Sequence, residues 1–157
     1  MRLITLLRHA KAVPEFAGGD FLRPLSKRGL AQAREAASTC QTEAWIPDLI
    51  LASPATRTRE TARIISESLR PPAKLCTDPA LYLAPPAKLL DALAALPDTA
   101  RHVLLVGHNP GLSELAASLL HEPSLDSLQT GKTIRLKLTL PAWSGIYSAI
   151  ATRLVTT

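Results

Sequence analysis

The sequence is poor in cysteine and in long apolar runs, and both shortages exclude classes of protein. Its two cysteines, Cys40 and Cys76, form no metal-binding or redox motif, so we expect core or subsurface thiols rather than a disulfide framework. No apolar stretch approaches the roughly 18 residues that a membrane-spanning helix requires. The first apolar run leads directly into charge, unlike the layout of a signal peptide. We therefore predict a cytoplasmic protein that does not enter the membrane.

Aromatic and acidic residues are also scarce. The chain has two residues each of Phe, Trp and Tyr, and its 13 acidic residues are outnumbered by 18 basic ones, for a net charge of +5. That excess favours anionic partners. Because the basic residues form no long run and few aromatic residues accompany them, we do not expect a nucleic-acid surface. A phosphorylated protein or a small phosphate ester fits this charge better.

Metal-binding motifs are missing as well. The sequence holds no clustered pair of aspartates, and it has no His-rich motif of the kind that binds a transition metal. We therefore expect neither a metal ion nor another cofactor.

The chain is long enough for one domain with a full core, and we predict a single domain over residues 1–157. Apolar runs predict buried strands at residues 3–7, 49–52 and 102–106. An alternating run predicts a half-buried strand at residues 133–140, which pairs with a last strand at residues 146–155. A short edge strand is predicted at residues 74–76. Helical spacing and cap signals at Ser26 and Ser53 predict helices over residues 27–44, 54–69, 88–96 and 112–121.

This order of elements predicts an α/β fold. We expect a three-layer α/β/α sandwich, with a mostly parallel central sheet and a C-terminal antiparallel hairpin. Ligands of such sheets bind at the carboxyl ends of the strands. Three of the predicted buried strands end in Arg8-His9, Ser53-Pro54 and Gly107-His108. If these strands are parallel neighbours, their polar ends meet at one edge.

Arg8, His9 and Arg57 are the first candidates for chemistry. A single His after a strand is usually structural, but the adjacent Arg8 needs an anionic partner, which favours a role in binding an oxyanion. Arg57 lies in the first turn of a predicted helix, where free N–H groups already attract anions and a guanidinium can bind phosphate with two hydrogen bonds. Arg59, two residues further on, is expected to face solvent. We interpret His9 as a nucleophile toward phosphorus.

His108 is the next candidate, because it lies between a strand and a helix start that is flanked by glycines. Gly107 and Gly111 allow a tight turn, from which His108 can donate a hydrogen bond to a phosphoryl oxygen. His102 and His121 are expected to be structural or exposed. Together with His9 and the two arginines, His108 would form a cationic pocket that stabilises a phosphoryl group in transfer, without needing a metal ion.

Three segments carry a family resemblance: Leu7-Arg8-His9-Ala10, residues 53–61 and residues 106–110. They resemble the three motifs of the histidine phosphatase superfamily, and the chain is most similar to its SixA-type phosphohistidine phosphatase branch. The resemblance implies a phosphoglycerate-mutase-like fold and a covalent phosphohistidine on His9. It also implies that the oxygens of that group are held by Arg8, Arg57 and His108.

Two further residues are candidates for substrate binding. Arg23 matches the Arg-Pro-Leu segment of the branch and would reach the same pocket; the alternative is a cation that only stabilises its loop. Asn109 follows His108; for this residue the alternative is a role in shaping the turn.

The chain departs from the superfamily at the leaving-group acid. Phosphomonoesterases of the superfamily protonate an alcohol, a step worth roughly 100- to 10,000-fold in rate. The corresponding region, residues 79–86, contains Tyr82 but no Asp or Glu. An imidazole, with a pKa near 6.5, is a better leaving group and needs less help. The missing acid favours a phosphoramidate substrate, although Glu15, Asp20 and Asp78 could replace it if their loops fold inward.

Three functions remain open from the sequence. The leading hypothesis is a metal-independent phosphatase that hydrolyses phosphohistidine on a protein, such as a histidine phosphotransfer domain. The second is a phosphomonoesterase of the same superfamily that acts on a small phosphate ester. The third is a phosphate-binding or regulatory module without turnover.

Overall fold

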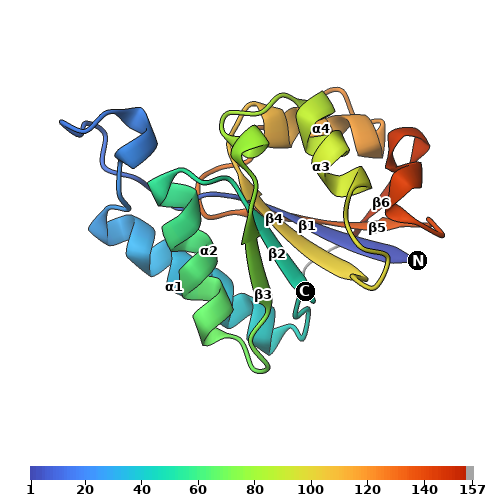
Figure 1. Ribbon diagram of the computed structural model, residues 1–157, viewed down its shortest axis with the longest axis horizontal. Helices are drawn as coiled ribbons and strands as arrows, with labels where there is room; N and C mark the ends of the chain where they lie inside the picture. Colours follow the sequence, from blue (N-terminus) through green and yellow to red (C-terminus); the bar gives the residue numbers. More distant parts are fainter. Residues whose placement is uncertain (155–157) are drawn as a thin grey trace.

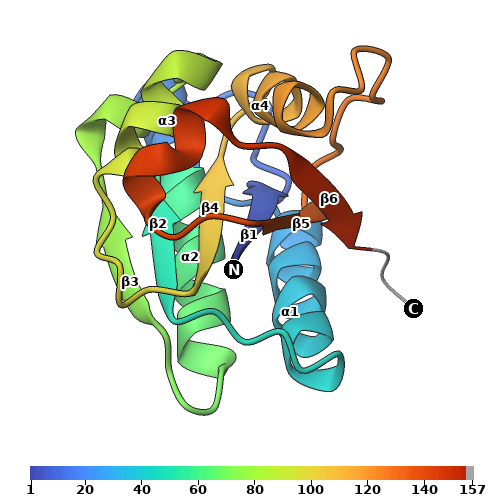
Figure 2. The ribbon, with the colours of Figure 1, turned by 90° about the vertical axis from the view of Figure 1, so that its right-hand side faces the viewer.

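The computed structural model describes residues 1–154, in which six strands form one mixed sheet of order β3-β2-β4-β1-β5-β6. The strands are β1 (Arg2–Arg8), β2 (Leu49–Ala52), β3 (Lys74–Thr77), β4 (His102–Gly107), β5 (Thr133–Leu138) and β6 (Ala151–Leu154). The first four are parallel, whereas β5 runs antiparallel to β1 and β6 antiparallel to β5 (Figures 1 and 2). The predicted parallel sheet with a C-terminal antiparallel hairpin is confirmed.

Helices cover both faces of this sheet (Figure 1). One face carries α1 (Lys27–Thr42) and α2 (Thr56–Ser68); the other carries α3 (Pro86–Ala94), α4 (Gly111–Leu120) and the 3-10 helix η3 (Trp143–Ser148). Alternate residues of the central strands point to the two layers: Leu7 packs in the cluster under α1 and α2, and Leu6 in the cluster under α3 and α4. Because both faces are covered, these strands read as continuous apolar runs.

Most element positions agree with the sequence analysis, but two predictions are wrong. The helix after β2 begins at Thr56 instead of residue 54, and its N-cap is Ala55, not Ser53. The Ser53 hydroxyl lies 2.7 Å from His108 and accepts only a long bond, 3.4 Å, from the Ala55 amide. The predicted last strand does not begin at residue 146. Residues 143–148 form η3, since Trp143 and Ile146 are buried in the cluster under α3 and α4. The end of that predicted strand, Val155, lies outside the described residues.

Other predictions hold or stay open. Ser26 caps α1 by accepting a hydrogen bond from the Gly29 amide, 3.1 Å from its Oγ. Both cysteines are free thiols, and burial raises the pKa of Cys40 to about 12. Within residues 1–154, no helix has the length and apolarity to cross a bilayer. The cytoplasmic location and the single domain over residues 1–157 stay predictions.

Candidate active site

The carboxyl ends of β1, β2 and β4 meet at one edge of the sheet. Arg8 pairs with Gly107 across β1 and β4, and Ala52 pairs with Val106 across β2 and β4. The residues that follow these strand ends are therefore neighbours in space, as the sequence predicted. This edge brings together the side chains of His9, Ser53 and His108, with Arg57 from the first turn of α2.

His9 is buried and held as a neutral imidazole with a defined tautomer. Its Nδ1 lies 2.7 Å from the Ala10 carbonyl oxygen, which can only accept, so the ring proton is on Nδ1. The other nitrogen, Nε2, accepts a hydrogen bond from Arg57 Nε over 3.3 Å. Burial, together with the nearby Arg57 and Arg8 cations and against the hydrogen bond to Ala10, lowers the pKa of His9 to about 4. His9 thus carries a free electron pair on Nε2 at pH 7.

His108 is also buried and neutral. Its Nε2 lies 2.7 Å from Ser53 Oγ, and its Nδ1 lies 3.3 Å from Arg57 Nη2. Because a guanidinium has only donors, Nδ1 accepts and Nε2–H donates to the serine. Burial, followed by the charge of Arg57, lowers the pKa of His108 to about 3. The two imidazole rings are neighbours at the strand ends, with their centroids 5.4 Å apart.

Arg57 connects the two histidines. Its side chain is 2% exposed, and the edge formed by Nε and Nη2 faces the two imidazole rings. The adjoining end edge, which shares Nη2, is held by Asp20: Nη1 donates to its carbonyl oxygen over 2.8 Å, and Nη2 to its Oδ2 over 3.1 Å. A planar guanidinium that faces a free imidazole nitrogen is suited to hold an oxyanion on that nitrogen.

Arg8 supplies a second cation beside His9. Its Nη1 donates to the Leu128 carbonyl oxygen over 3.1 Å. Its Nε is buried and has no hydrogen-bond partner among the described residues. An unmet buried donor costs about 1–3 kcal/mol. A bound oxyanion is the kind of partner that would remove this cost.

Among the described residues, Arg23 is linked to His9, Arg57 and His108 by its contact with Asp20. Its Nε and Nη2 lie 3.0 and 2.9 Å from Asp20 Oδ1, and its Nη1 donates to the Val13 carbonyl oxygen. Its predicted contact with substrate stays a prediction.

Asn109 lies against the loop before β5. Its Nδ2 donates to Ser127 Oγ and to the Leu128 carbonyl oxygen, and its Oδ1 accepts from the Ser113 hydroxyl. Because Leu128 also accepts from Arg8, Asn109 supports the segment that holds that arginine. Its predicted contact with substrate likewise stays a prediction.

Of the three acids considered as proton donors, only Asp20 contacts the residues of this site. Its Oδ2 accepts a hydrogen bond from the Tyr82 hydroxyl, and the bonds from Tyr82 and then Arg23 lower the pKa of Asp20 to about 2. Asp20 is therefore ionised at pH 7 and has no proton to donate. Asp78 instead caps the 3-10 helix η2 (Pro79–Leu81), and Glu15 is exposed.

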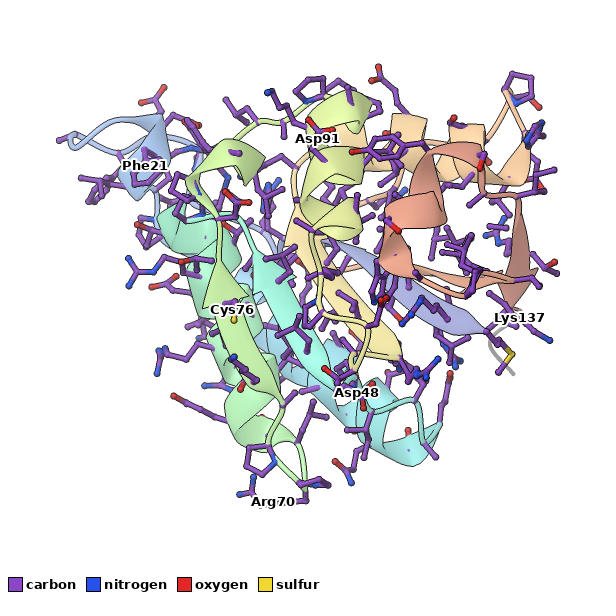
Figure 3. All side chains as sticks on the ribbon, turned by 45° about the vertical axis from the view of Figure 1, so that its right-hand side comes forward. Phe21, Asp48, Arg70, Cys76, Asp91 and Lys137 are labelled. Carbon is purple, nitrogen blue, oxygen red and sulfur yellow. The ribbon has the colours of Figure 1, made fainter. Side chains whose placement is uncertain are left out.

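Tyr82 forms one wall of the site. Its ring meets His108 edge-on, with centroids 5.6 Å apart, and Phe21 packs against its other side at 5.0 Å. A Cβ at Gly111 would overlap the carbonyl oxygen of Ala84, so glycine lets α4 begin against the segment that carries Tyr82. Figure 3 shows Phe21 on the segment that connects β1 to α1.

Sequence reasoning missed the role of Ser53. A Ser-Pro pair after a strand is a strong signal for a helix start, so the local pattern predicts a helix cap at Ser53. The signal that indicates a contact with His108 is the position of Ser53 at the end of a central strand, on the same edge of the sheet.

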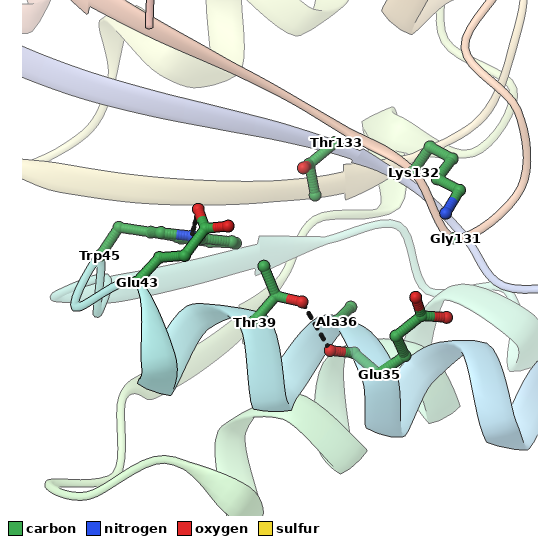
Figure 4. A pocket seen from close by; sticks show the side chains of 8 residues that line it. All are labelled: Glu35, Ala36, Thr39, Glu43, Trp45, Gly131, Lys132 and Thr133. Carbon is green, nitrogen blue, oxygen red and sulfur yellow. Dashed lines mark hydrogen bonds between the residues drawn. The ribbon is translucent and has the colours of Figure 1, made fainter. Parts of the chain in front are cut away.

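The chemistry-bearing side chains do not line the cleft beside α1. That cleft, of about 200 Å³, lies between α1 and the start of β5 and is lined by residues such as Glu35, Thr39 and Thr133 (Figure 4). His9, Arg57 and His108 are not among its lining residues. The candidate active site is therefore the edge formed by the strand ends.

Comparison with known families agrees with this geometry. A family model described as "Histidine phosphatase superfamily (branch 1)" matches residues 4–82, which include Arg8, His9 and Arg57. An uncharacterized chloroplastic protein of Arabidopsis thaliana is 33% identical over 135 residues, or 79% of this chain and 61% of the relative. An uncharacterized protein of Mycobacterium tuberculosis is 32% identical over 113 residues, 72% of this chain and 69% of that protein. The chain thus spans about three fifths of the length of the plant relative.

Solved structures show the same architecture. A crystal structure from Agrobacterium tumefaciens, provisionally described as the phosphohistidine phosphatase SixA, superposes with a TM-score of 0.78 at 30% identity, over 87% of this chain and 91% of that one. The protein histidine phosphatase SixA complexed with tungstate gives a TM-score of 0.77 at 23% identity, over 98% and 94% of the two chains, which shows the fold alone. The predicted phosphoglycerate-mutase-like fold is confirmed.

Proposed function

Because the chain belongs to the histidine phosphatase superfamily, we propose that it is a metal-independent phosphohistidine phosphatase that acts on a phosphorylated protein. One observation carries this proposal. The unprotonated Nε2 of a neutral, buried His9 lies 3.3 Å from Arg57 Nε, so the nucleophile and a cation for the transferred group are in direct contact.

The reaction proceeds in two displacements. His9 Nε2 attacks phosphorus, and the bond from phosphorus to the substrate imidazole breaks with its electron pair on the imidazole nitrogen, which takes a proton from water. Water then attacks the phosphorus, and the bond from phosphorus to Nε2 breaks with its electron pair on Nε2. The proton lost by the attacking water passes to solvent, where it replaces the one taken up by the leaving imidazole, and phosphate and the free imidazole of His9 remain. In both steps the guanidiniums of Arg57 and Arg8 stabilise the negative charge on the equatorial oxygens.

His108 changes its protonation state when the phosphoryl group binds. In the free protein its Nδ1 accepts from Arg57. A bound phosphoryl group brings negative charge next to the ring, which raises the pKa of His108 and favours the imidazolium. Nδ1–H then donates to a phosphoryl oxygen, while Nε2–H keeps its hydrogen bond to Ser53 and holds the ring in place.

Two features support a phosphohistidine on a protein as the substrate. The acid nearest the pocket, Asp20, is ionised, and an imidazole leaving group needs less proton donation than an alcohol. Exposed apolar side chains gather near the site on the loop of residues 13–23 and beside Tyr82: Phe16, Phe21, Leu22 and Leu83. Such side chains fit contact with a protein surface, as on a histidine phosphotransfer domain.

The test is to trap the intermediate. The protein is mixed with a histidine-phosphorylated phosphotransfer domain and quenched in alkali, and the label is mapped by mass spectrometry. We expect acid-labile, alkali-stable phosphate on His9, and a loss of turnover of at least about 1,000-fold in His9→Ala. His121→Asn, which changes an exposed histidine in a left-handed conformation that Asn tolerates, should retain full activity. A fully active His9→Ala variant would contradict the proposal.

The same assay separates the other functions. Higher kcat/KM for small phosphate monoesters than for phosphohistidine would indicate a phosphomonoesterase that uses the same mechanism. Binding of orthovanadate without turnover of any substrate would indicate a phosphate-binding module. EDTA should leave the rate unchanged, because guanidiniums supply the positive charge in this mechanism.

A further inference from the structure

Asp20 joins three separate segments of the chain at the edge of the site. It begins the 3-10 helix η1 (Asp20–Leu22). Its Oδ1 accepts from Arg23, and its Oδ2 accepts from Arg57 and from the Tyr82 hydroxyl. The side chain is 47% exposed, so this carboxylate lies at the surface while the guanidinium of Arg57 beneath it is buried.

The contacts of Asp20 divide the guanidinium of Arg57 into two edges. Asp20 occupies the end edge, with Nη1 on its carbonyl oxygen and Nη2 on its Oδ2. The side edge has no contact with Asp20: its Nε donates to His9 Nε2 over 3.3 Å, a weak bond that an oxyanion can replace. A guanidinium is planar and rigid, so holding the end edge sets the direction of the side edge.

We infer that Asp20 is a positioning residue for phosphoryl transfer: it fixes Arg57 so that the side edge of the guanidinium addresses a phosphoryl group on His9. The reaction in this statement rests on the function proposed above. Asp20 acts through Arg57 and does not itself contact the transferred group, because its carboxylate lies on the far edge of the guanidinium from His9 Nε2.

The charges around the site support this role. Arg8, Arg23 and Arg57 place three cations near His9, and each lies close enough to lower the pKa of that histidine. A buried guanidinium is costly without a paired anion. Asp20 supplies that anion when no substrate is bound, and it does so without covering the nucleophile.

The same carboxylate also sets the wall of the site. Tyr82 donates to Asp20 Oδ2, and its ring meets His108 edge-on. Asp20→Ala should therefore free Tyr82 and Nη2 of Arg57 from the carboxylate, while Nη1 keeps its bond to the backbone carbonyl oxygen. Tyr82→Phe removes only the bond between Tyr82 and Asp20. The two variants separate the two effects.

The test compares Asp20→Ala, Asp20→Glu and Glu35→Gln. Glu35 is exposed on α1, so Glu35→Gln changes the net charge by the same amount away from the site. For Asp20→Ala we expect kcat/KM for a phosphohistidine protein to fall about 10- to 100-fold, with a raised KM, and orthovanadate to bind more weakly by a similar factor. Asp20→Glu keeps the carboxylate and should recover part of both losses. Thermal unfolding verifies that each variant is folded, and Asp20→Asn replaces Asp20→Ala if the latter is not.

Each result supports or overturns the inference. Unchanged orthovanadate affinity and kcat/KM in Asp20→Ala overturn it. Tighter orthovanadate binding also overturns it, because Asp20 would then compete with the substrate for Arg57. If the wild-type protein does not hydrolyse phosphohistidine but Asp20→Ala still weakens orthovanadate binding, the proposed function fails and the role of Asp20 in positioning Arg57 stands.

Discussion

The two ends of the sheet each bury an arginine and a histidine, yet only one end is arranged for chemistry. At the amino end, the side chain of Arg2 is 0% exposed and His102 is buried; at the carboxyl end, the side chain of Arg57 is 2% exposed and His108 is buried. Burial lowers the pKa of His102 to about 4 and that of His108 to about 3. Burial, charge and pKa therefore do not distinguish the two ends.

The two ends of the sheet differ in the hydrogen-bond partners of these side chains. The terminal nitrogens of Arg2 donate to oxygens of Asp98, Ala100 and Pro141 over 2.7–3.1 Å. His102 is bound to the Thr5 hydroxyl at 2.8 Å. These partners are fixed parts of the fold.

At the carboxyl end, Arg57 faces two imidazole nitrogens, each over 3.3 Å. Contacts of that length are weak, and an oxyanion that binds between the rings can replace them. A candidate site is thus recognised by partners that a ligand can exchange.

Among the variants that test this comparison, the largest expected effect is on catalysis at the carboxyl end. Arg57→Ala removes the cation that faces His9, and we expect kcat/KM for a phosphohistidine protein to fall by about 100- to 1,000-fold. Arg59→Ala is the matched control, because Arg59 is exposed on the same helix. Steady-state kinetics measure both variants. Equal losses in the two would remove the distinction between the buried arginine and its exposed neighbour.

At the amino end, we expect the opposite pattern of effects. Arg2→Met takes this donor from the carbonyl oxygens of Asp98 and Pro141 and removes the cation above the Trp143 ring. The free energy of unfolding should fall by about 2–4 kcal/mol, while kcat/KM stays within about twofold of wild type. Urea titration measures the stability. Arg153→Met, at an exposed position of β6, should change it by less than about 0.5 kcal/mol.

The pH dependence of stability should come from both ends. The pKa values of His9, His102 and His108 are lowered to about 4, 4 and 3, whereas an unfolded histidine has its ordinary value near 6.5. Below pH 6.5 the unfolded chain binds more protons, so the stabilisation is complete above that pH and is lost as pH falls through 4 and toward 3. Each histidine contributes up to roughly 3–5 kcal/mol.

His102→Gln separates stability from activity in this window. The variant should show a weaker pH dependence of the unfolding midpoint, while the acid limb of its kcat/KM profile stays at the wild-type position. The profile is measured with the uncatalysed loss of phosphohistidine subtracted at each pH. A shift of that limb in His102→Gln would mean that the amino end takes part in the chemistry.

The smallest expected effect concerns the orientation of His108. Ser53→Ala leaves Nε2–H of the buried ring without its acceptor, and we expect kcat/KM to fall about tenfold. Ser66→Ala is the control, because the Ser66 hydroxyl bonds the Ala73 carbonyl oxygen, outside the site. If Ser53→Ala keeps full activity, the serine does not help to position the ring.

Much of this arrangement could be predicted from short-range patterns. The apolar runs at residues 3–7, 49–52 and 102–106 located three central strands, and the polar residues after them placed His9 and His108 on one edge. Arg57 followed from its place in the first turn of a helix. Local patterns suffice here because strand burial and helix starts depend on neighbouring residues.

The precise contacts depend on packing between distant segments. The position of Ser53 fits both a helix cap and a hydrogen-bond partner for His108. The structure has the second, a contact between residues that are 55 positions apart in the sequence. Asp20 meets Arg57 across 37 positions and Tyr82 across 62. The amino-acid sequence thus specified the three central strands, their polar ends and the position of His9, because those depend on local pattern. The tertiary structure decided that the Asp20 carboxylate contacts Arg57 and that the Ser53 hydroxyl contacts His108. These contacts form only when loops pack onto the edge of the sheet and bring distant residues together.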